Sequence, residues 1–70
     1  MMGSEMILFR ILLITILNGE PVDRQEIAIY EIRSTLENCQ KNIKPAFDRY
    51  YVAKDSYKME LKTVTECMKL

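Results

Sequence analysis

A run of apolar residues near the start of the chain constrains the fold most strongly. Residues 6–17 read MILFRILLITIL, and Asn18-Gly19 follows directly. These twelve residues are too few for a membrane-spanning helix, which needs about 20. β-Branched and aromatic residues in a run that ends at Asn-Gly are typical of a buried strand before a tight hairpin turn. We therefore predict a strand over residues 6–17, a type I′ turn after it, and no transmembrane segment.

The same run also has the length of the apolar core of a signal peptide. However, Glu5 stands where such a peptide carries basic residues, and Arg10 interrupts the run. The NGEP sequence that follows contains no small-residue cleavage pattern. We expect a cytoplasmic protein. The alternative is an exported protein in which residues 6–17 act as a signal sequence.

A second strand and a helix are predicted after the turn. Pro21 cannot donate a backbone hydrogen bond, so the strand that begins at residue 22 or 25 and ends at Ile32 is expected at the sheet edge. Ser34 opens a Ser-x-x-Glu capping box, which predicts the start of a helix. A residue before proline disfavours the helical conformation, so the helix should stop or kink at Pro45. The residues expected to face the sheet follow at helical spacing: Leu36, Cys39 and Ile43.

Two further strands are predicted in the C-terminal half. Residues 49–54 are aromatic and β-branched, and Asp55-Ser56 is a turn sequence. Apolar and charged residues alternate over residues 57–67, which predicts a half-solvated strand; a helix is the competing interpretation. The expected fold is a small α+β domain over residues 6–70, after a disordered start at residues 1–5. Its antiparallel sheet has the order ββαββ, or ββαβ if residues 49–54 form a loop, with one helix on one face.

The composition argues against several classes of function. The chain has no histidine, which removes the commonest general base and the commonest metal ligand. Its two cysteines cannot complete a zinc site, and its two glycines form no phosphate-binding loop. We therefore expect no catalytic activity, no metal and no cofactor. Ten basic and ten acidic residues give a net charge of zero, which removes the long-range attraction that nucleic-acid binding relies on.

Cys39 and Cys67 are candidate disulfide partners. One lies on the apolar stripe of the predicted helix and the other on the apolar face of the last strand, so the two can meet in the core. The alternative is a pair of small buried thiols. Because the signal sequence is unconvincing, we favour free thiols.

The first predicted strand is apolar on both faces except at Arg10 and Thr15. One helix covers one face, so something else must cover the other. The simplest solution is a two-fold homodimer, which forms by stacking of the sheets or by pairing of their edges. Arg10 is expected to pair with Glu26 or Glu31. The expected interface residues are Leu8, Arg10, Leu12, Ile14 and Ile16.

A second candidate surface combines cations with aromatic rings on the predicted C-terminal hairpin. Such a surface can follow phosphates and stack on bases. An ordinary solvated strand face is the interpretation that we favour, because nearby acidic residues dilute the positive charge. The residues of this candidate nucleic-acid or partner surface are Arg49, Tyr50, Tyr51, Lys54, Lys58 and Lys62.

Five pieces of the chain resemble, in their order, a broad group of very small phage- and prophage-type bacterial proteins. They are residues 7–17, 18–22, 27–32, 34–38 with Cys39, and 50–52. The resemblance implies a phage or mobile-element origin and no mechanism, because the functions of that group are mostly unassigned. Members often carry a second cysteine on the strand after the helix. Here Val52 or a neighbour stands at that place, and the second cysteine is Cys67.

The function expected from these observations is a small, non-catalytic, phage-encoded protein-interaction module. It would bind a host protein, associate with itself, or do both. One alternative is a nucleic-acid-binding accessory protein that uses the hairpin of residues 49–62. The other is a small exported protein that is stabilised by a disulfide.

Overall fold

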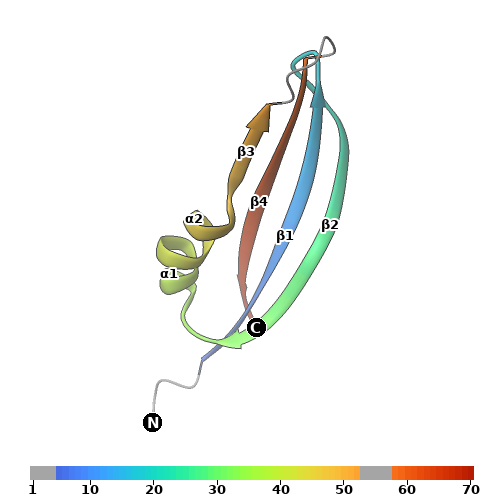
Figure 1. Cartoon of the computed structure of the whole chain (residues 1–70). Coiled ribbons are helices and arrows are strands. Elements are labelled where there is room, and N and C mark those ends of the chain that lie inside the picture. Colours follow the sequence, from blue (N-terminus) through green and yellow to red (C-terminus); the bar gives the residue numbers. More distant parts are fainter. Residues whose placement is uncertain (1–4, 53–57) are drawn as a thin grey trace.

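The long apolar strand lies at the centre of a four-stranded antiparallel sheet (Figure 1). The computed structural model describes residues 5–52 and 58–70. The sheet has the order β2-β1-β4-β3. Its strands are β1 Met6–Leu17, β2 Glu20–Arg33, β3 Arg49–Val52 and β4 Met59–Lys69. The predicted ββαββ fold is confirmed, and so is the strand interpretation of the alternating C-terminal segment.

The central position of β1 bears on the signal-sequence alternative. β1 pairs with β2 along one side and with β4 along the other. Cleavage after residue 17 would remove the strand that joins these two neighbours.

The predicted disordered start lies outside the described residues except for Glu5, whose carbonyl accepts a 3.0 Å hydrogen bond from the Ser34 N–H. The predicted turn at Asp55-Ser56 lies outside them as well.

The hairpin between β1 and β2 has the predicted turn. Asn18 and Gly19 have φ angles of 53° and 82°, and a type I′ turn needs positive φ at both central positions. β2 is an edge strand, as Pro21 predicts, although it begins earlier than expected, at Glu20. The β1–β2 register shifts twice, between Ile11 and Leu12 and between Thr15 and Ile16.

The helix differs from the prediction at its N-cap and at Pro45. It consists of α1 (Leu36–Asn38), a π-helical segment η1 (Cys39–Ile43) and α2 (Lys44–Phe47). Its N-cap is Thr35, one residue after the predicted Ser34. Of the two predicted outcomes at Pro45, a stop or a kink, the stop is wrong, because the helix continues past the proline. Proline lacks an N–H and its ring crowds the preceding turn. The π-helical turn just before it, in which the Lys44 N–H bonds to the Cys39 carbonyl, gives that ring more room.

Replacement of Thr35 by alanine is expected to lower the free energy of unfolding by about 1 kcal/mol. The Thr35 hydroxyl accepts the Asn38 backbone N–H at 3.0 Å, and alanine would leave that donor without its partner. Ser34→Ala is the matched control, because the Ser34 hydroxyl meets only the exposed side-chain amide of Asn38. Urea denaturation measures both variants. An equal or larger loss in Ser34→Ala would contradict the assignment of the cap.

The core lies between the helix and one face of the sheet. Ile7, Phe9 and Ile11 of β1 are buried against Cys39. Ile43 packs against the same cluster, so the predicted inward positions of Cys39 and Ile43 are confirmed. Leu36 is half-buried. The partly buried residues that complete this layer from the strands are Ala28, Ile32 and Cys67.

A polar contact joins the end of the helix to β4. The Asp48 carboxylate accepts the Thr65 backbone N–H at 2.7 Å and the Lys44 ammonium at 2.9 Å. Lys44 also donates to the Thr65 carbonyl at 3.1 Å. Burial alone would raise the pKa of Asp48, but the hydrogen bonds from Lys44 and Thr65 outweigh it and lower this pKa below its ordinary value. The ionised form of Asp48 therefore stabilises the fold.

Asp48→Asn is expected to lower stability at neutral pH and to reduce the loss of stability in acid. A carboxylate whose pKa is lower in the folded state stabilises fully above its unfolded pKa of about 4 and loses this effect as the pH falls through the folded pKa. Urea midpoints measured between pH 7 and pH 2 test this. Parallel pH profiles for the wild type and Asp48→Asn would contradict it.

Candidate interaction surface

The sheet face away from the helix, here called the open face, carries the even-numbered residues of β1. Within the described residues no helix lies over this face, since the helix packs on the opposite one (Figure 1). Cross-strand partners share a face, so the pairs of Arg10 with Ile29 and with Glu66 both lie here. The five predicted interface residues of β1 are therefore on one face.

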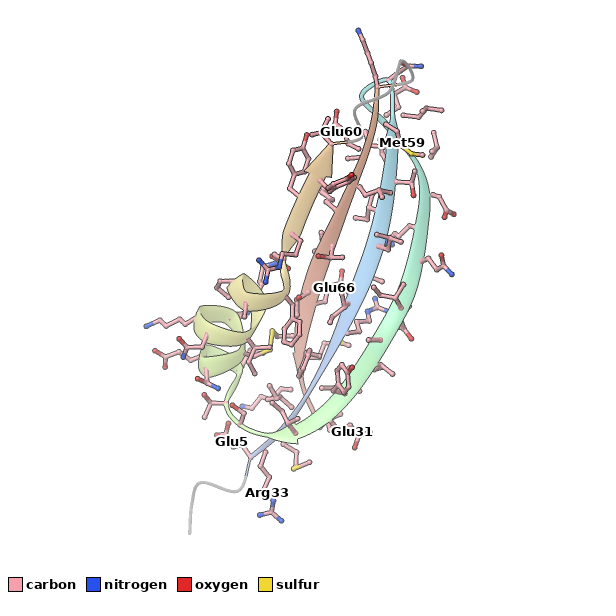
Figure 2. The ribbon with its side chains drawn as sticks, viewed as in Figure 1. Glu5, Glu31, Arg33, Met59, Glu60 and Glu66 are labelled. Carbon is pink, nitrogen blue, oxygen red and sulfur yellow. A yellow bond between two sulfur atoms is a disulfide. The ribbon has the colours of Figure 1, made fainter. Side chains whose placement is uncertain are left out.

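Four charged side chains, here called the charged cluster, lie across the middle of the open face. The Arg10 Nε donates to Glu66 Oε1 at 2.8 Å, and its Nη1 lies 3.3 Å from Glu26 Oε1. The hydrogen bond to Glu66, followed by that to Glu26, raises the pKa of Arg10 above its ordinary value. Arg24 completes the cluster, with its Nη2 at 3.4 Å from Glu66 Oε2. Figure 2 shows Glu66 near the middle of the sheet.

The side chains of the charged cluster cover part of the open face. Arg24 is on β2 and Glu66 is on β4, so their ion pair crosses β1 between the positions of Arg10 and Ile14. Leu12 lies between those two positions and is only 3% exposed. The aliphatic parts of arginine and glutamate side chains cover apolar surface in this way while their charges stay in water. Leu12 is therefore closed to a partner, and Arg10 is already paired.

The predicted ion pair of Arg10 with Glu26 is confirmed, but Glu31 is not among its partners. The sequence interpretation missed Glu66, which accepts the shorter hydrogen bond. Glu66 lies 56 positions away from Arg10 and reaches it only because β4 pairs with β1. The charge alternation of the last strand gave no information about that pairing.

The accessible apolar surface lies mainly at the ends of the open face and along β2. Leu8, Ile14 and Ile16 are half-buried. On β2, in contrast, most large apolar side chains are exposed, and Ile29 has an exposed fraction of 51%. The exposed apolar side chains of β2 are Val22, Ile27, Ile29 and Tyr30. The surface that a partner can reach is thus centred on the sheet edge, and the middle of the sheet is covered.

The basic and aromatic residues of the second candidate surface do not gather on one face. The register pairs Tyr50 with Lys62 and Tyr51 with Leu61, so neighbouring residues of β3 alternate between the open face and the helix face. The Tyr50 hydroxyl donates to Glu60, and this hydrogen bond raises the pKa of Tyr50. Arg49 lies on the helix face with Tyr51. Lys58, which directly precedes β4, is exposed, and Lys54 lies outside the described residues.

Cys39 and Cys67 are joined by a disulfide between the helix and β4. Their Cα atoms lie 6.1 Å apart, within the ordinary range for a disulfide. The preference for free thiols in the sequence interpretation is therefore corrected. That preference depended on the expected cellular compartment, whereas the helix and the strand bring the two side chains together whatever the compartment. The bond closes a loop with a sequence separation of 28 residues.

A small hollow lies on the helix face beyond the end of the helix. Its volume is about 180 Å³, below the roughly 300 Å³ at which ligand pockets usually begin. The residues that line it are Leu13, Arg49, Tyr51, Leu61, Lys62 and Thr63. Among the described residues, no three histidine, cysteine, aspartate or glutamate side chains come close enough together to hold a metal ion. In that same part of the chain, no helix is long and apolar enough to cross a membrane.

Comparisons with protein-family models, with curated proteins and with solved structures found no match to this chain.

Proposed function

We propose that this chain is a non-catalytic protein-interaction module that acts first by associating with a second copy of itself. The observation that carries the proposal is the exposed apolar surface of β2 in a sheet of only four strands. Ile29 lies on the open face and Tyr30 on the helix face, so this edge strand exposes large apolar side chains on both of its sides. A chain of 70 residues also has a thin core and gains stability from a shared one.

The charged cluster favours a protein partner over a nucleic acid. It balances two arginines with two glutamates on the same face, so it offers no net positive field to a phosphate backbone. The cations and aromatic rings of the C-terminal hairpin also alternate between two faces. A second copy of this chain, in contrast, supplies the same apolar edge residues and no net charge.

Sedimentation equilibrium of the wild-type protein at micromolar concentrations tests the proposal. We expect an average mass that rises from 8.3 kDa toward twice that value as concentration increases. The midpoint of this rise should change little with salt, because an apolar contact is not screened. A monomer at every concentration would contradict self-association. The partner to seek would then be a foreign protein, such as a host protein.

The disulfide supports a second candidate, an exported protein of an oxidising compartment. Structural disulfides persist outside the reducing cytoplasm, and this one joins two buried or half-buried residues across the core. This reading does not use residues 6–17 as a cleaved signal, because they form the central strand. A count of free thiols in protein isolated from its native cell, under conditions that block exchange, tests it. Two free thiols per chain would contradict this candidate and favour a protein of the reducing cytoplasm.

A further inference from the structure

We propose that the interface is the outer edge of β2, where residues 28–32 of two copies pair as antiparallel strands around a two-fold axis at Tyr30. This inference rests on the proposed self-association and names its contact surface. The two four-stranded sheets would then form one continuous sheet, with both helices on the same side.

The backbone N–H and C=O groups on the outer side of β2 have no partner strand in the described sheet. The Ser34 N–H bonds to the Glu5 carbonyl, and the Leu70 N–H bonds to the Met6 carbonyl. In an antiparallel ladder, bonded pairs alternate with non-bonded pairs. Odd-numbered residues of β1 therefore face β2, and their partners Ala28, Tyr30 and Ile32 face inward. By the same alternation, the backbone groups of Ile29, Glu31 and Arg33 point away from the sheet.

The side chains along this stretch do not oppose pairing. Natural sheet edges avoid association through proline, charged side chains, bulges or short strands. The part of β2 up to Ile27 has such features, since Pro21 and both register shifts lie there. Residues 28–33 have a regular register and contain no proline, and their two charged side chains, Glu31 and Arg33, have opposite signs. β3, at the other edge of the described sheet, has only four residues. The pairing edge is therefore the second half of β2.

A second copy fits this edge in one register better than in its neighbours. An axis at Tyr30 sets the two tyrosines opposite each other, Ala28 opposite Ile32, and Ile29 opposite Glu31. Aromatic pairs directly across two strands are stabilising. An axis at Glu31 would oppose two carboxylates, and an axis at Ile29 would draw the register shift near Ile27 into the interface. The Tyr30 axis is therefore the register that keeps the regular stretch paired with itself.

A charge-reversal series in sedimentation equilibrium tests this interface. Ile29→Glu sets a second carboxylate opposite Glu31 at two symmetric positions, and we expect it to raise the dimer dissociation constant at least about tenfold. Val22→Glu is the matched control: it is on the same strand, similarly exposed (57% against 51%) and outside the paired stretch. It should change the constant less than about twofold. The double variant Ile29→Glu/Glu31→Lys should recover most of the lost affinity, because unlike charges then oppose each other.

Each departure from this pattern has a distinct meaning. A wild-type dimer that Ile29→Glu leaves unchanged would overturn the β2 interface, although self-association itself would stand. Equal weakening by Val22→Glu, or no recovery in the double variant, would overturn the Tyr30 register. A wild type that is monomeric throughout would overturn both the interface and the proposed function. Far-UV circular dichroism shows that each variant is folded before its mass is interpreted.

Discussion

Reduction of the Cys39–Cys67 disulfide is expected to lower the free energy of unfolding by roughly 3–4 kcal/mol. This follows from the loop of 28 residues that the bond closes in the unfolded chain. A core of this size supplies only about 3–5 kcal/mol, so the reduced protein should be largely unfolded near 37 °C. Urea denaturation with and without reductant measures the difference.

The double variant Cys39→Ala/Cys67→Ala is the control for this experiment. It should be about as unstable as the reduced wild type and should not respond to reductant. A wild type whose urea midpoint does not move on reduction, while its thiols become reactive, would contradict a stabilising disulfide. Unfolding on reduction would also give the protein a redox-dependent lifetime in any cell that contains both oxidising and reducing compartments.

Phe9→Ala is the single substitution with the largest expected effect, a loss of about 3–5 kcal/mol. Phe9 is 5% exposed and lies at the centre of the core. Its ring centroid is 5.1 Å from that of Tyr30 and 5.8 Å from that of Phe47, so it joins β1 to β2 and to the end of the helix. Alanine would remove both aromatic contacts and leave a cavity that a thin core cannot refill.

Phe47→Ala serves as the comparison for Phe9→Ala. Phe47 contacts the same ring but is 43% exposed, so its truncation should cost well under half as much. Thermal or urea unfolding of the two variants gives the ratio. Equal losses would mean that the core is centred nearer the helix than the structure shows.

Local signals in the sequence predicted most of the elements. The apolar run, the Asn18-Gly19 turn and the C-terminal alternation each act over a few neighbouring residues, and each appears in the structure as expected. The helix start was displaced by one residue, because Ser34 and Thr35 are both good capping residues and only the backbone geometry selects between them. The predicted stop at Pro45 is wrong, and only the alternative of an irregularity there is left, because a π-helical turn before Pro45 accommodates the proline ring.

Contacts between distant residues were harder to predict. The pairing of β1 with β4 is not encoded in either strand alone, and it is this pairing that brings Glu66 to Arg10. The sequence interpretation therefore left two dimers open, one in which the open faces stack and one in which the sheet edges pair. In the structure the charged cluster covers its centre, and the accessible apolar surface lies instead along the edge strand. The proposed self-association therefore keeps the edge-paired alternative and not the stacked one.

Residue-resolved hydrogen exchange of the β2 amides, at low and high protein concentration, tests self-association through this edge most directly. The inward-facing amides of Tyr30 and Ile32 should be protected at both concentrations, because they bond to β1. The outward-facing amides of Ile29 and Glu31 should exchange quickly in the dilute protein and become protected in the concentrated protein. Fast exchange of Ile29 and Glu31 at every concentration, in a sample that sediments as a dimer, would contradict the β2 interface.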